Sequence, residues 1–305
     1  MKIAVIDIGT NTVLLLIAKI TNGVIETLAY EQRTPRLGKN IDAEGVIGKP
    51  AFTRVLEVLK EYKKLIEEHN PDKIVAFGTS VLREVANKEE FLAFIKNEIG
   101  FDIEILTSDE EAYWSYRGAV SGIRENGNIV VIDIGGGSTE ISQGSLTEVK
   151  CTNSINVGAV RITERFFKNN PPTQAEINLA SEFIKTAIEK LGECKFTDEK
   201  LIGVAGTPTT LASIDLGLKD FDVTKISGHR MSFERIQEIF KKLCKMKSEE
   251  IRELSNATEG RADIITAGTL ILIEFMKYGN FKEIIVSERG VRYGVAIREW
   301  EKNNS

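Results

Sequence analysis

Two stretches of the chain place an acidic residue and a glycine-rich or hydroxyl-rich turn at the end of an apolar strand. Residues 130–142 read VVIDIGGGSTEIS, in which Asp133 interrupts the apolar run and Ser138, Thr139 and Glu140 follow three glycines. A carboxylate at the end of a buried strand is costly unless a cation faces it, and a divalent metal ion is a common partner. Glycines let backbone N–H groups approach a bound anion. The stretch predicts a site for a metal and an anion, with a plain tight hairpin as the alternative.

The start of the chain repeats this pattern. Residues 2–20 contain an apolar strand, then Asp7, then a second apolar strand after a turn made of Gly9, Thr10, Asn11 and Thr12. Asp7 therefore occupies the place that Asp133 has in the later stretch. Such a repeat predicts two similar halves, each opening with strand, turn and strand. Two turns of this kind, facing each other across a cleft, would bracket a chain of phosphates.

Two further turns lead from a strand into a helix and carry groups that bind anions. Thr79 and Ser80 follow a predicted strand at 72–78, and Arg83 lies in the first turns of the short helix after them. Residues 206–213, GTPTTLAS, form a second turn of this type. Helix N-termini favour anions, so both are candidate phosphate sites. For the first, an ordinary helix cap beside an exposed arginine explains the residues equally well.

The net charge of −5 over 305 residues argues against a nucleic acid duplex as partner, because proteins that bind duplexes show a basic excess. A small polyanion could still bind to local groups of basic residues. These occur at Arg33, Arg36, Lys39, Arg83, Arg161, Arg165, Arg289 and Arg292. Taken singly, each is more simply explained as a solvated surface charge.

Composition narrows the remaining classes of protein. Apolar residues make up 42% and charged residues 28%, as in ordinary soluble proteins. The N-terminus enters a core strand at once and no apolar run approaches the roughly 20 residues of a membrane span, so we expect no signal peptide, no membrane segment and a cytoplasmic location. The wide spacing of Cys151, Cys194 and Cys244 makes a disulfide framework or zinc site unexpected. With only His69 and His229 present, a catalytic base should be a carboxylate.

The predicted elements form an α/β order of three strands, helix, strand, helix, strand and helix, given twice. In the first half, strands after the opening pair lie at 24–31, 72–78 and 102–106, and helices begin at 50, 79, 88 and 108. In the second half, strands lie at 128–134, 138–144, 146–151, 200–205 and 282–287, with helices at 158–168, 174–191, 232–244 and 259–278. We expect domains of 1–126 and 127–305, with the last helix able to pack back on the first.

This order is that of the ribonuclease H-like domains of the actin, Hsp70 and sugar kinase superfamily. Within it, the sequence resembles the exopolyphosphatase/guanosine pentaphosphate phosphohydrolase (Ppx/GppA) family, in a short two-domain form, over about residues 3–296. The resemblance implies two such domains with a cleft between them. The matching motifs are DIGTNT at Asp7, RLG at Arg36, GTSVLREVAN at Gly78, SDEEA at Ser108, DIGGGSTE at Asp133, GAVRITERF at Gly158, AGTPTTLA at Ala205, GRADII at Gly260 and VSERGVRYG at Val286.

The resemblance implies a role for each group. In the family, the second acid of the E-E-A element is taken as the base that activates water, and that position is Glu111 here; the alternative is that Glu111, with Asp109 and Glu110, only matches the helix dipole. Phosphoanhydride hydrolysis needs such a base and positive charge at the transferred phosphoryl group. Mg²⁺ would be held by Asp7, Asp133 and Glu140. The phosphates would be bound by Gly9, Thr10, Asn11, Arg36, Thr79, Arg83, Gly135, Gly136, Gly137, Ser138, Thr139, Gly206, Thr207 and Arg261.

The implied activity is hydrolysis of the terminal phosphate of inorganic polyphosphate, with guanosine pentaphosphate, a nucleotide of the stringent response, as the competing substrate. Tyr113 stands where the family usually has arginine and Glu288 where it usually has aspartate, which leaves substrate preference open. An ATP-dependent kinase or ATPase of the same superfold and a non-catalytic guanosine pentaphosphate sensor are alternatives. The intact acids Glu111, Asp133 and Glu140 argue against the sensor. A monomer and a homodimer both stay open.

Overall fold

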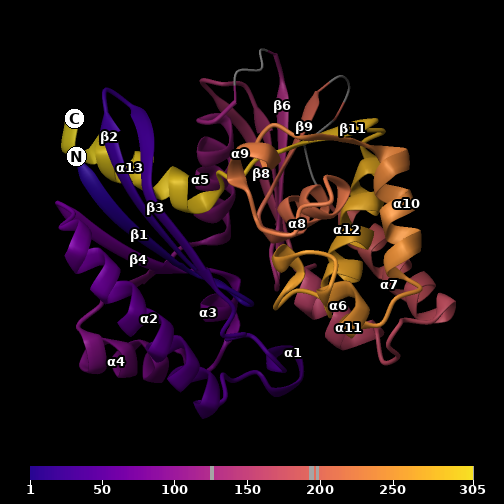
Figure 1. The fold of residues 1–305 in the computed structure, drawn as a ribbon, viewed down its shortest axis with the longest axis horizontal. Helices are drawn as coiled ribbons and strands as arrows, with labels where there is room; N and C mark the ends of the chain where they lie inside the picture. Colours follow the sequence, from indigo (N-terminus) through magenta and orange to yellow (C-terminus); the bar gives the residue numbers. More distant parts are fainter. Residues whose placement is uncertain (124–126, 192–195, 197–198, 305) are drawn as a thin grey trace. The chain divides into compact units, whose positions relative to one another are not determined.

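The computed structural model describes residues 1–123, 127–191, 196 and 199–304. The contacts divide the chain into two compact units: unit 1 consists of Met1–Gly118 and Val291–Ser305, and unit 2 of Ala119–Gly290. The domain boundary that we predicted after residue 126 lies outside the described residues. Unit 1 takes in the last helix of the chain, drawn in yellow in Figure 1.

Unit 1 is built on a five-stranded sheet with the order β3-β2-β1-β4-β5. β2 pairs antiparallel with β1 and with β3, whereas β1, β4 and β5 are parallel. This is the ribonuclease H-like order that the sequence predicted. The strands are β1 (Lys2–Ile8), β2 (Val13–Thr21), β3 (Val24–Arg33), β4 (Lys73–Gly78) and β5 (Ile103–Ile105).

Helices cover both faces of this sheet. On one face, Ala4 and Ile6 of β1 pack with residues of α2 (Lys49–His69) and α4 (Lys88–Ile99). On the other, Ile3 and Val5 pack with α13 (Val291–Asn304) and with Trp114 of α5 (Ser108–Val120). Because side chains alternate along a strand, Asp7 is on the face of α5 and α13. The short helices of this unit are α1 (Ile41–Glu44) and α3 (Ser80–Glu84).

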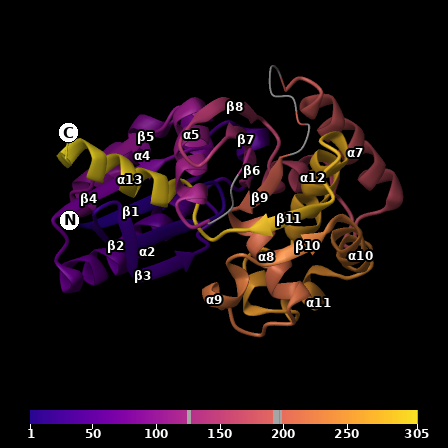
Figure 2. The ribbon, with the colours of Figure 1, turned by 90° about the horizontal axis from the view of Figure 1, so that it is seen from above.

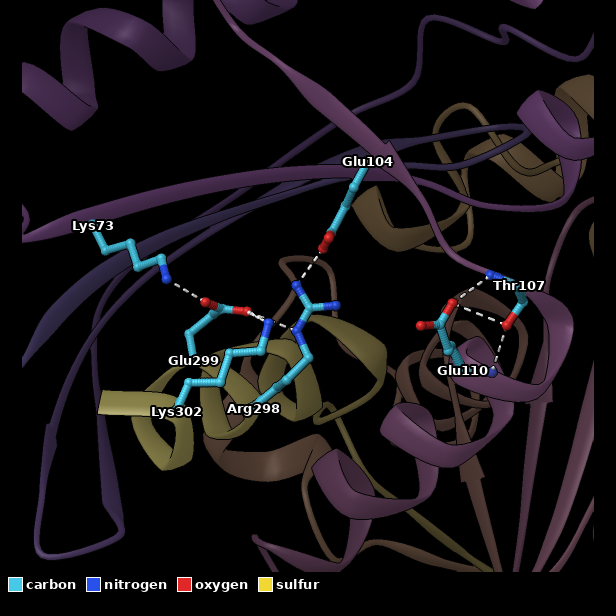
Figure 3. Close-up of polar contacts among 7 residues, drawn as sticks. All are labelled: Lys73, Glu104, Thr107, Glu110, Arg298, Glu299 and Lys302. Carbon is cyan, nitrogen blue, oxygen red and sulfur yellow. Dashed lines mark hydrogen bonds and ion pairs between the residues drawn. The ribbon is translucent and has the colours of Figure 1, made fainter. Parts of the chain in front are cut away.

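An ion cluster fastens α13 to the sheet of unit 1 (Figure 3). The buried carboxylate of Glu299 accepts hydrogen bonds from Lys73 of β4, from Arg298 Nε at 2.7 Å and from Lys302 Nζ at 2.9 Å. Arg298 also pairs with Glu104 of β5. The C-terminal helix therefore returns to the unit in which the chain begins.

Unit 2 is built on a six-stranded sheet with the order β10-β11-β9-β6-β7-β8. β6, β9 and β11 are parallel, and β7 pairs antiparallel with β6 and with β8, so the arrangement of unit 1 recurs. An additional antiparallel strand, β10, which the sequence did not predict, extends the edge. The strands are β6 (Ile129–Ile134), β7 (Thr139–Gly144), β8 (Val149–Ile155), β9 (Lys200–Val204), β10 (Arg230–Ser232) and β11 (Glu283–Val286).

The core of unit 2 joins one face of this sheet to several helices, and α12 (Ile265–Tyr278) lies beside α7 (Gln174–Ile188) and α10 (Phe233–Leu243) (Figure 2). Two predicted starts were wrong by three residues or more, and so were two predicted ends, because β8 ends at Ile155 and not at 151, and α7 ends at Ile188 and not at 191. β8 starts at Val149 and not at 146, and the helix predicted from 259 starts at Ile265, since Gly260 has a φ of 73° that no right-handed helix can continue. The helices are α6 (Ala159–Phe166), α7 (Gln174–Ile188), α8 (Gly206–Asp215), α9 (Val223–Ile226), α10 (Phe233–Leu243), α11 (Ser248–Arg252), the 3₁₀ helix η1 (Asn256–Thr258) and α12 (Ile265–Tyr278).

One prediction from the cysteines needs correction. Cys151 in β8 is disulfide-bonded, although the wide spacing of the cysteines gave no reason to expect this, because separation along the chain does not set separation in the fold. Cys194 lies outside the described residues, and Cys244 is a free thiol. Within the described ranges, no helix is both long and apolar enough to cross a membrane.

Candidate functional site

In each unit, the predicted site residues follow the carboxyl ends of parallel strands. In unit 1, β1 leads into Gly9, β4 into Thr79 and β5 towards α5. In unit 2, β6 leads into Gly135, β9 into Gly206 and β11 into residues 287–290. Carboxyl ends of parallel neighbours meet at one edge of a sheet, which is where open α/β sheets bind ligands. Each unit therefore gathers its candidate residues at one edge.

The sequence repeat is also a repeat of backbone geometry. The N–H of Gly9 donates to the carbonyl of Thr12 at 2.9 Å, and the N–H of Gly135 donates to the carbonyl of Ser138 at 3.0 Å. In each turn, the N–H of the first residue thus donates to the carbonyl of the fourth, and the turn joins two strands. The predicted equivalence of the two opening stretches is confirmed at the level of the turn.

In unit 1, the loop that contains Arg36 holds the carbonyls of the turn. The carbonyl of Thr10 accepts from Gly38 N at 2.7 Å and that of Asn11 accepts from Arg36 N at 3.0 Å. Arg36 adopts a positive φ of 53°, which is uncommon for a residue other than glycine. In a trans peptide the C=O and the next N–H point in opposite directions. The N–H groups of Asn11 and Thr12 therefore point away from this loop.

In unit 2, the first turn of α6 holds two carbonyls of the glycine turn. The N–H groups of Ala159 and Val160 donate to the carbonyls of Gly135 and Gly136, each at 2.9 Å. The approach requires glycine at 158, because a Cβ there would lie 2.3 Å from the carbonyl oxygen of Gly136. By the same peptide geometry, the N–H groups of Gly136 and Gly137 point away from α6. Successive N–H groups that point to one side form an anion-binding concavity.

Two predicted metal ligands face each other across adjacent strands of unit 2. Asp133 of β6 is directly opposite Glu140 of β7, so the two carboxylates share one face of the sheet. They are 8% and 2% exposed. Glu140 is in turn opposite Ser154 of β8, whose Oγ donates to Glu140 Oε1 at 2.8 Å. In unit 1, Asp7 is opposite Leu14 and has no carboxylate in the corresponding place.

This donor set fits Mg²⁺, which usually takes one or two carboxylates and completes its shell with phosphate oxygens and water. The described part of the chain contains no group of three or more His, Cys, Asp or Glu side chains that could hold a metal ion by themselves. That Asp133 and Glu140 hold such an ion together with the substrate stays a prediction. That Asp7 also takes part stays a prediction.

The predicted base lies in an ion pair with a predicted substrate ligand. Arg83 Nη1 donates to Glu111 Oε2 at 2.6 Å and to the carbonyl of Leu106 at 3.0 Å, and Glu111 is 8% exposed. The neighbouring acid has a different task. Glu110 Oε2 accepts from the N–H and the hydroxyl of Thr107, both at 2.9 Å, and the N–H of Glu110 donates back to the Thr107 hydroxyl at 3.2 Å (Figure 3). The backbone hydrogen bond from Thr107 lowers the pKa of Glu110.

Thr107 and Glu110 thus form a capping box at the start of α5. Capping accounts for Glu110 and not for Glu111, whose carboxylate is directed to Arg83 of α3.

Arg261 meets the turn between β9 and α8. A Cβ on Gly206 would lie 1.6 Å from Arg261 Nη1, so the guanidinium lies against the backbone of that turn. Ala205, directly before it, has φ 68° and ψ −165°, a region occupied almost only by glycine. The side chain of Thr207 faces α12, because a Cβ on Gly268 would lie 2.3 Å from its Oγ1. Gly206 and Arg261 are therefore brought together, whereas the Thr207 hydroxyl is used in packing.

The hydroxyls of two other predicted ligands are also placed within the fold. Thr139 Oγ1 donates to the carbonyl of Val157 at 2.6 Å and is buried, which ties β7 to the segment before α6. Thr79 is buried at the start of α3 and makes no side-chain capping bond, so the expected cap is absent. α3 itself, Ser80–Glu84, is shorter than predicted.

Two residues at the site were missed by sequence reasoning. Arg161, which we had explained as a surface charge, donates from Nε to the carbonyl of Gly137 at 2.9 Å. Ser154 was not considered at all, although it bonds Glu140. The signal for Arg161 was its place in the first turn of the helix that follows Gly158, a second glycine after the glycine turn.

A model of the Ppx/GppA phosphatase family matches residues 16–303. The chain belongs to the Ppx/GppA phosphatase family. Its resemblance to that family is thereby confirmed.

Relatives in the Ppx/GppA family carry different names. "Exopolyphosphatase 2" of Mycobacterium tuberculosis is 31% identical over 97% of this chain and 98% of its own length. A "Bifunctional 3-dehydroquinate synthase/phosphatase" of Fusobacterium nucleatum is 33% identical, but this chain spans only 46% of it. A "Guanosine-5'-triphosphate,3'-diphosphate pyrophosphatase" of Aeromonas salmonicida is 26% identical, and this chain spans 58% of it.

A solved Ppx/GppA structure supports the fold. The Aquifex aeolicus family member is 33% identical, with a TM-score of 0.84 over 100% of this chain and 99% of that one. The two ribonuclease H-like units are therefore those of the Ppx/GppA proteins. The hydroxyl of Tyr113 accepts from Arg117 Nη1 at 3.2 Å.

Proposed function

We propose that this chain hydrolyses the terminal phosphate of inorganic polyphosphate, by attack of a water molecule that Glu111 orients and deprotonates. The observation that carries the proposal is the ion pair between half-buried Arg83 and buried Glu111 at the carboxyl edge of the unit 1 sheet. A base for water has to be held in position, and a carboxylate that accepts a hydrogen bond from a guanidinium is held in this way.

Arg83 has a second use in this proposal. Hydrolysis of a phosphoanhydride places negative charge on the transferred phosphoryl oxygens, and fixed cations stabilise that charge. A guanidinium offers five N–H donors, so Arg83 can keep one bond to Glu111 and donate others to a phosphate. The base and the phosphoryl group would then be held by one side chain, which sets the distance between them.

Within each unit, the glycine and hydroxyl turn would bind phosphate. Backbone N–H groups of Asn11 and Gly137 belong to the two rows of donors that point away from the supporting loop and from α6. Arg36 and Arg261 would add positive charge at the edges of units 1 and 2. Asp133 and Glu140 would hold Mg²⁺, whose positive charge would stabilise the negative charge on the phosphate oxygens.

Guanosine pentaphosphate is the second candidate substrate, since a relative with the guanosine pyrophosphatase name aligns over 96% of this chain. We put polyphosphate first as the proposed substrate, because this chain matches 98% of the length of the relative named exopolyphosphatase and 58% of the length of the relative named pyrophosphatase.

One preparation should be tested for phosphate release from short polyphosphate, long polyphosphate and guanosine pentaphosphate, with the Glu111→Gln chain as the blank. We expect release from polyphosphate at a higher kcat/KM than from the nucleotide. A higher kcat/KM for the nucleotide would favour the second substrate. No release from any of the three would overturn the hydrolase proposal.

A further inference from the structure

The glycine turn of unit 2 has three consecutive carbonyls that are held from the side of α6. Backbone N–H groups hold the first two: Ala159 donates to Gly135, and both Val160 and Arg161 donate to Gly136, the last at 3.2 Å. The third carbonyl, that of Gly137, accepts from the side chain of Arg161 at 2.9 Å. The side chain of Arg161 thus holds the one of these three carbonyls that, within the described part of the chain, accepts no hydrogen bond from the backbone of α6.

Each held carbonyl sets the direction of the N–H that follows it. Since the peptides of this turn are trans, fixing the carbonyls of Gly136 and Gly137 directs the N–H groups of Gly137 and Ser138 to the opposite side. Without the Arg161 contact, the peptide between Gly137 and Ser138 would lose the bond that fixes its plane from this side. The direction of the N–H groups would then be fixed only as far as that of Gly137, and not for Ser138.

The first turn of the chain solves the same problem in another way. There, the carbonyl of Asn11, which corresponds to that of Gly137, accepts from the backbone N–H of Arg36 at 3.0 Å. Unit 1 uses a loop residue with a positive φ of 53° to bring that N–H into place. In unit 2 the helix takes the place of the loop, and a side chain has to supply the missing donor. Two unrelated devices fix the same carbonyl in the two halves.

The neighbouring arginine on α6 shows that this contact is specific. Arg165 lies one turn further along the helix, is exposed, and has its guanidinium over the ring of Phe183 at 5.4 Å. Arg161 is half-buried and bonded to the turn through both its backbone and its side chain. A charge-assisted bond to a carbonyl also polarises the peptide, which makes the N–H on its other side a stronger donor.

We propose that Arg161 is a positioning residue for phosphate: it fixes the Gly137 carbonyl and thereby aims the N–H of Ser138 at the bound anion. The proposal rests on the proposed function only in that this turn binds a substrate phosphate. It needs no contact between Arg161 and the substrate. It assigns to α6 the role of a rigid support behind the donor row.

The test uses the full chain with Glu111→Gln, so that substrate is not consumed, and inorganic tripolyphosphate with Mg²⁺ as the probe in calorimetry. Arg161→Met keeps the length of the side chain and removes the donor; we expect it to weaken binding about tenfold, as loss of one well-placed charge-assisted hydrogen bond does. Arg161→Lys, which keeps a charged donor, should recover most of that affinity. Arg165→Met, the matched control on the same helix, should bind like the parent.

A structural role alone would lower the melting temperature without this pattern of binding. Unchanged affinity in Arg161→Met, or equal weakening in Arg165→Met, would overturn the proposal. Should Arg161→Met fail to fold, the amide resonances of the parent decide: added tripolyphosphate must shift the Ser138 N–H, and no shift overturns the proposal. These results are separate from the hydrolase assay, because a chain that binds tripolyphosphate through Arg161 but releases no phosphate would contradict only the proposed function.

Discussion

Arg83 Nη1 and Glu111 Oε2 lie 2.6 Å apart, in an ion pair that joins α3 to α5 within unit 1. Glu110, the adjacent acid, is bonded instead to Thr107 at the start of the same helix (Figure 3). Two consecutive glutamates therefore have separate tasks, one in capping a helix and one facing an arginine. This separation gives the matched pair of variants for testing the base.

Glu111→Gln should reduce turnover by about 100-fold or more while substrate still binds, because the amide keeps the shape of the side chain and cannot accept the proton. Steady-state phosphate release, together with binding of tripolyphosphate, measures both effects. Glu110→Gln is the control: glutamine can keep the capping box, so the loss of stability should be well under about 1 kcal/mol, with turnover nearly unchanged. Near-normal activity in Glu111→Gln would remove Glu111 from the role of base.

Ser154→Ala should weaken metal binding through Glu140, although Ser154 is not itself a predicted ligand. Groups that orient a metal ligand typically account for about 10-fold to 100-fold in affinity. Mn²⁺ binding, followed by electron paramagnetic resonance in the presence of tripolyphosphate, measures this without turnover. Thr152→Ala, two residues earlier on the same face of β8, is the control and should leave Mn²⁺ affinity unchanged. Equal Mn²⁺ affinity in Ser154→Ala and the parent would show that the Ser154 hydroxyl does not support the site.

Ala205→Gly should stabilise the protein, which is the reverse of the usual effect of glycine. The backbone of Ala205, with φ 68° and ψ −165°, is strained by about 1–3 kcal/mol in a residue with a Cβ. Glycine relieves this strain. It also increases the conformational entropy of the unfolded chain, which lowers the free energy of unfolding by about 0.4–1 kcal/mol. We expect a net gain of about 1 kcal/mol, or about 2–4 °C in melting temperature. Gly217→Ala, at a φ of 64° with open space around the Cβ, should do the opposite, and a loss of stability in Ala205→Gly would show that this turn is not strained.

The stability that α13 draws from Glu299 should depend on pH in the acid range. Burial by itself raises the pKa of Glu299, but the hydrogen bonds from Lys73, Lys302 and Arg298 outweigh it and lower the pKa from 4.5 to about 2. A lowered pKa means that the contribution is complete above about pH 4.5 and is lost as the pH falls towards 2. Between pH 5 and 3, the melting temperature of the parent should therefore fall more steeply than that of Glu299→Gln.

At pH 7, Glu299→Gln should cost about 2 kcal/mol, because charged donors lose their acceptor. Glu283→Gln is the control: it breaks an exposed pair with Arg230 and should cost well under 1 kcal/mol. Equal acid sensitivity in the parent and in Glu299→Gln would show that this cluster does not hold α13.

What the sequence determined by itself was local. The two turns close within four residues, from Gly9 to Thr12 and from Gly135 to Ser138, so their geometry depends on residues that are adjacent in the sequence. The apolar runs likewise predicted the strands around Asp7 and Asp133, and the order of elements predicted the ribonuclease H-like sheets. These features need no information from distant parts of the chain.

Tertiary structure alone decided which distant groups meet. Strand register placed Ser154 opposite Glu140, and the packing of α3 against α5 paired Arg83 with Glu111 and not with Glu110. The docking of α6 on the glycine turn changed Arg161 from an apparent surface charge into a donor to Gly137. Each of these contacts joins residues at least fourteen positions apart. A hydrogen bond needs a match within a few tenths of an ångström, which only the packed fold supplies.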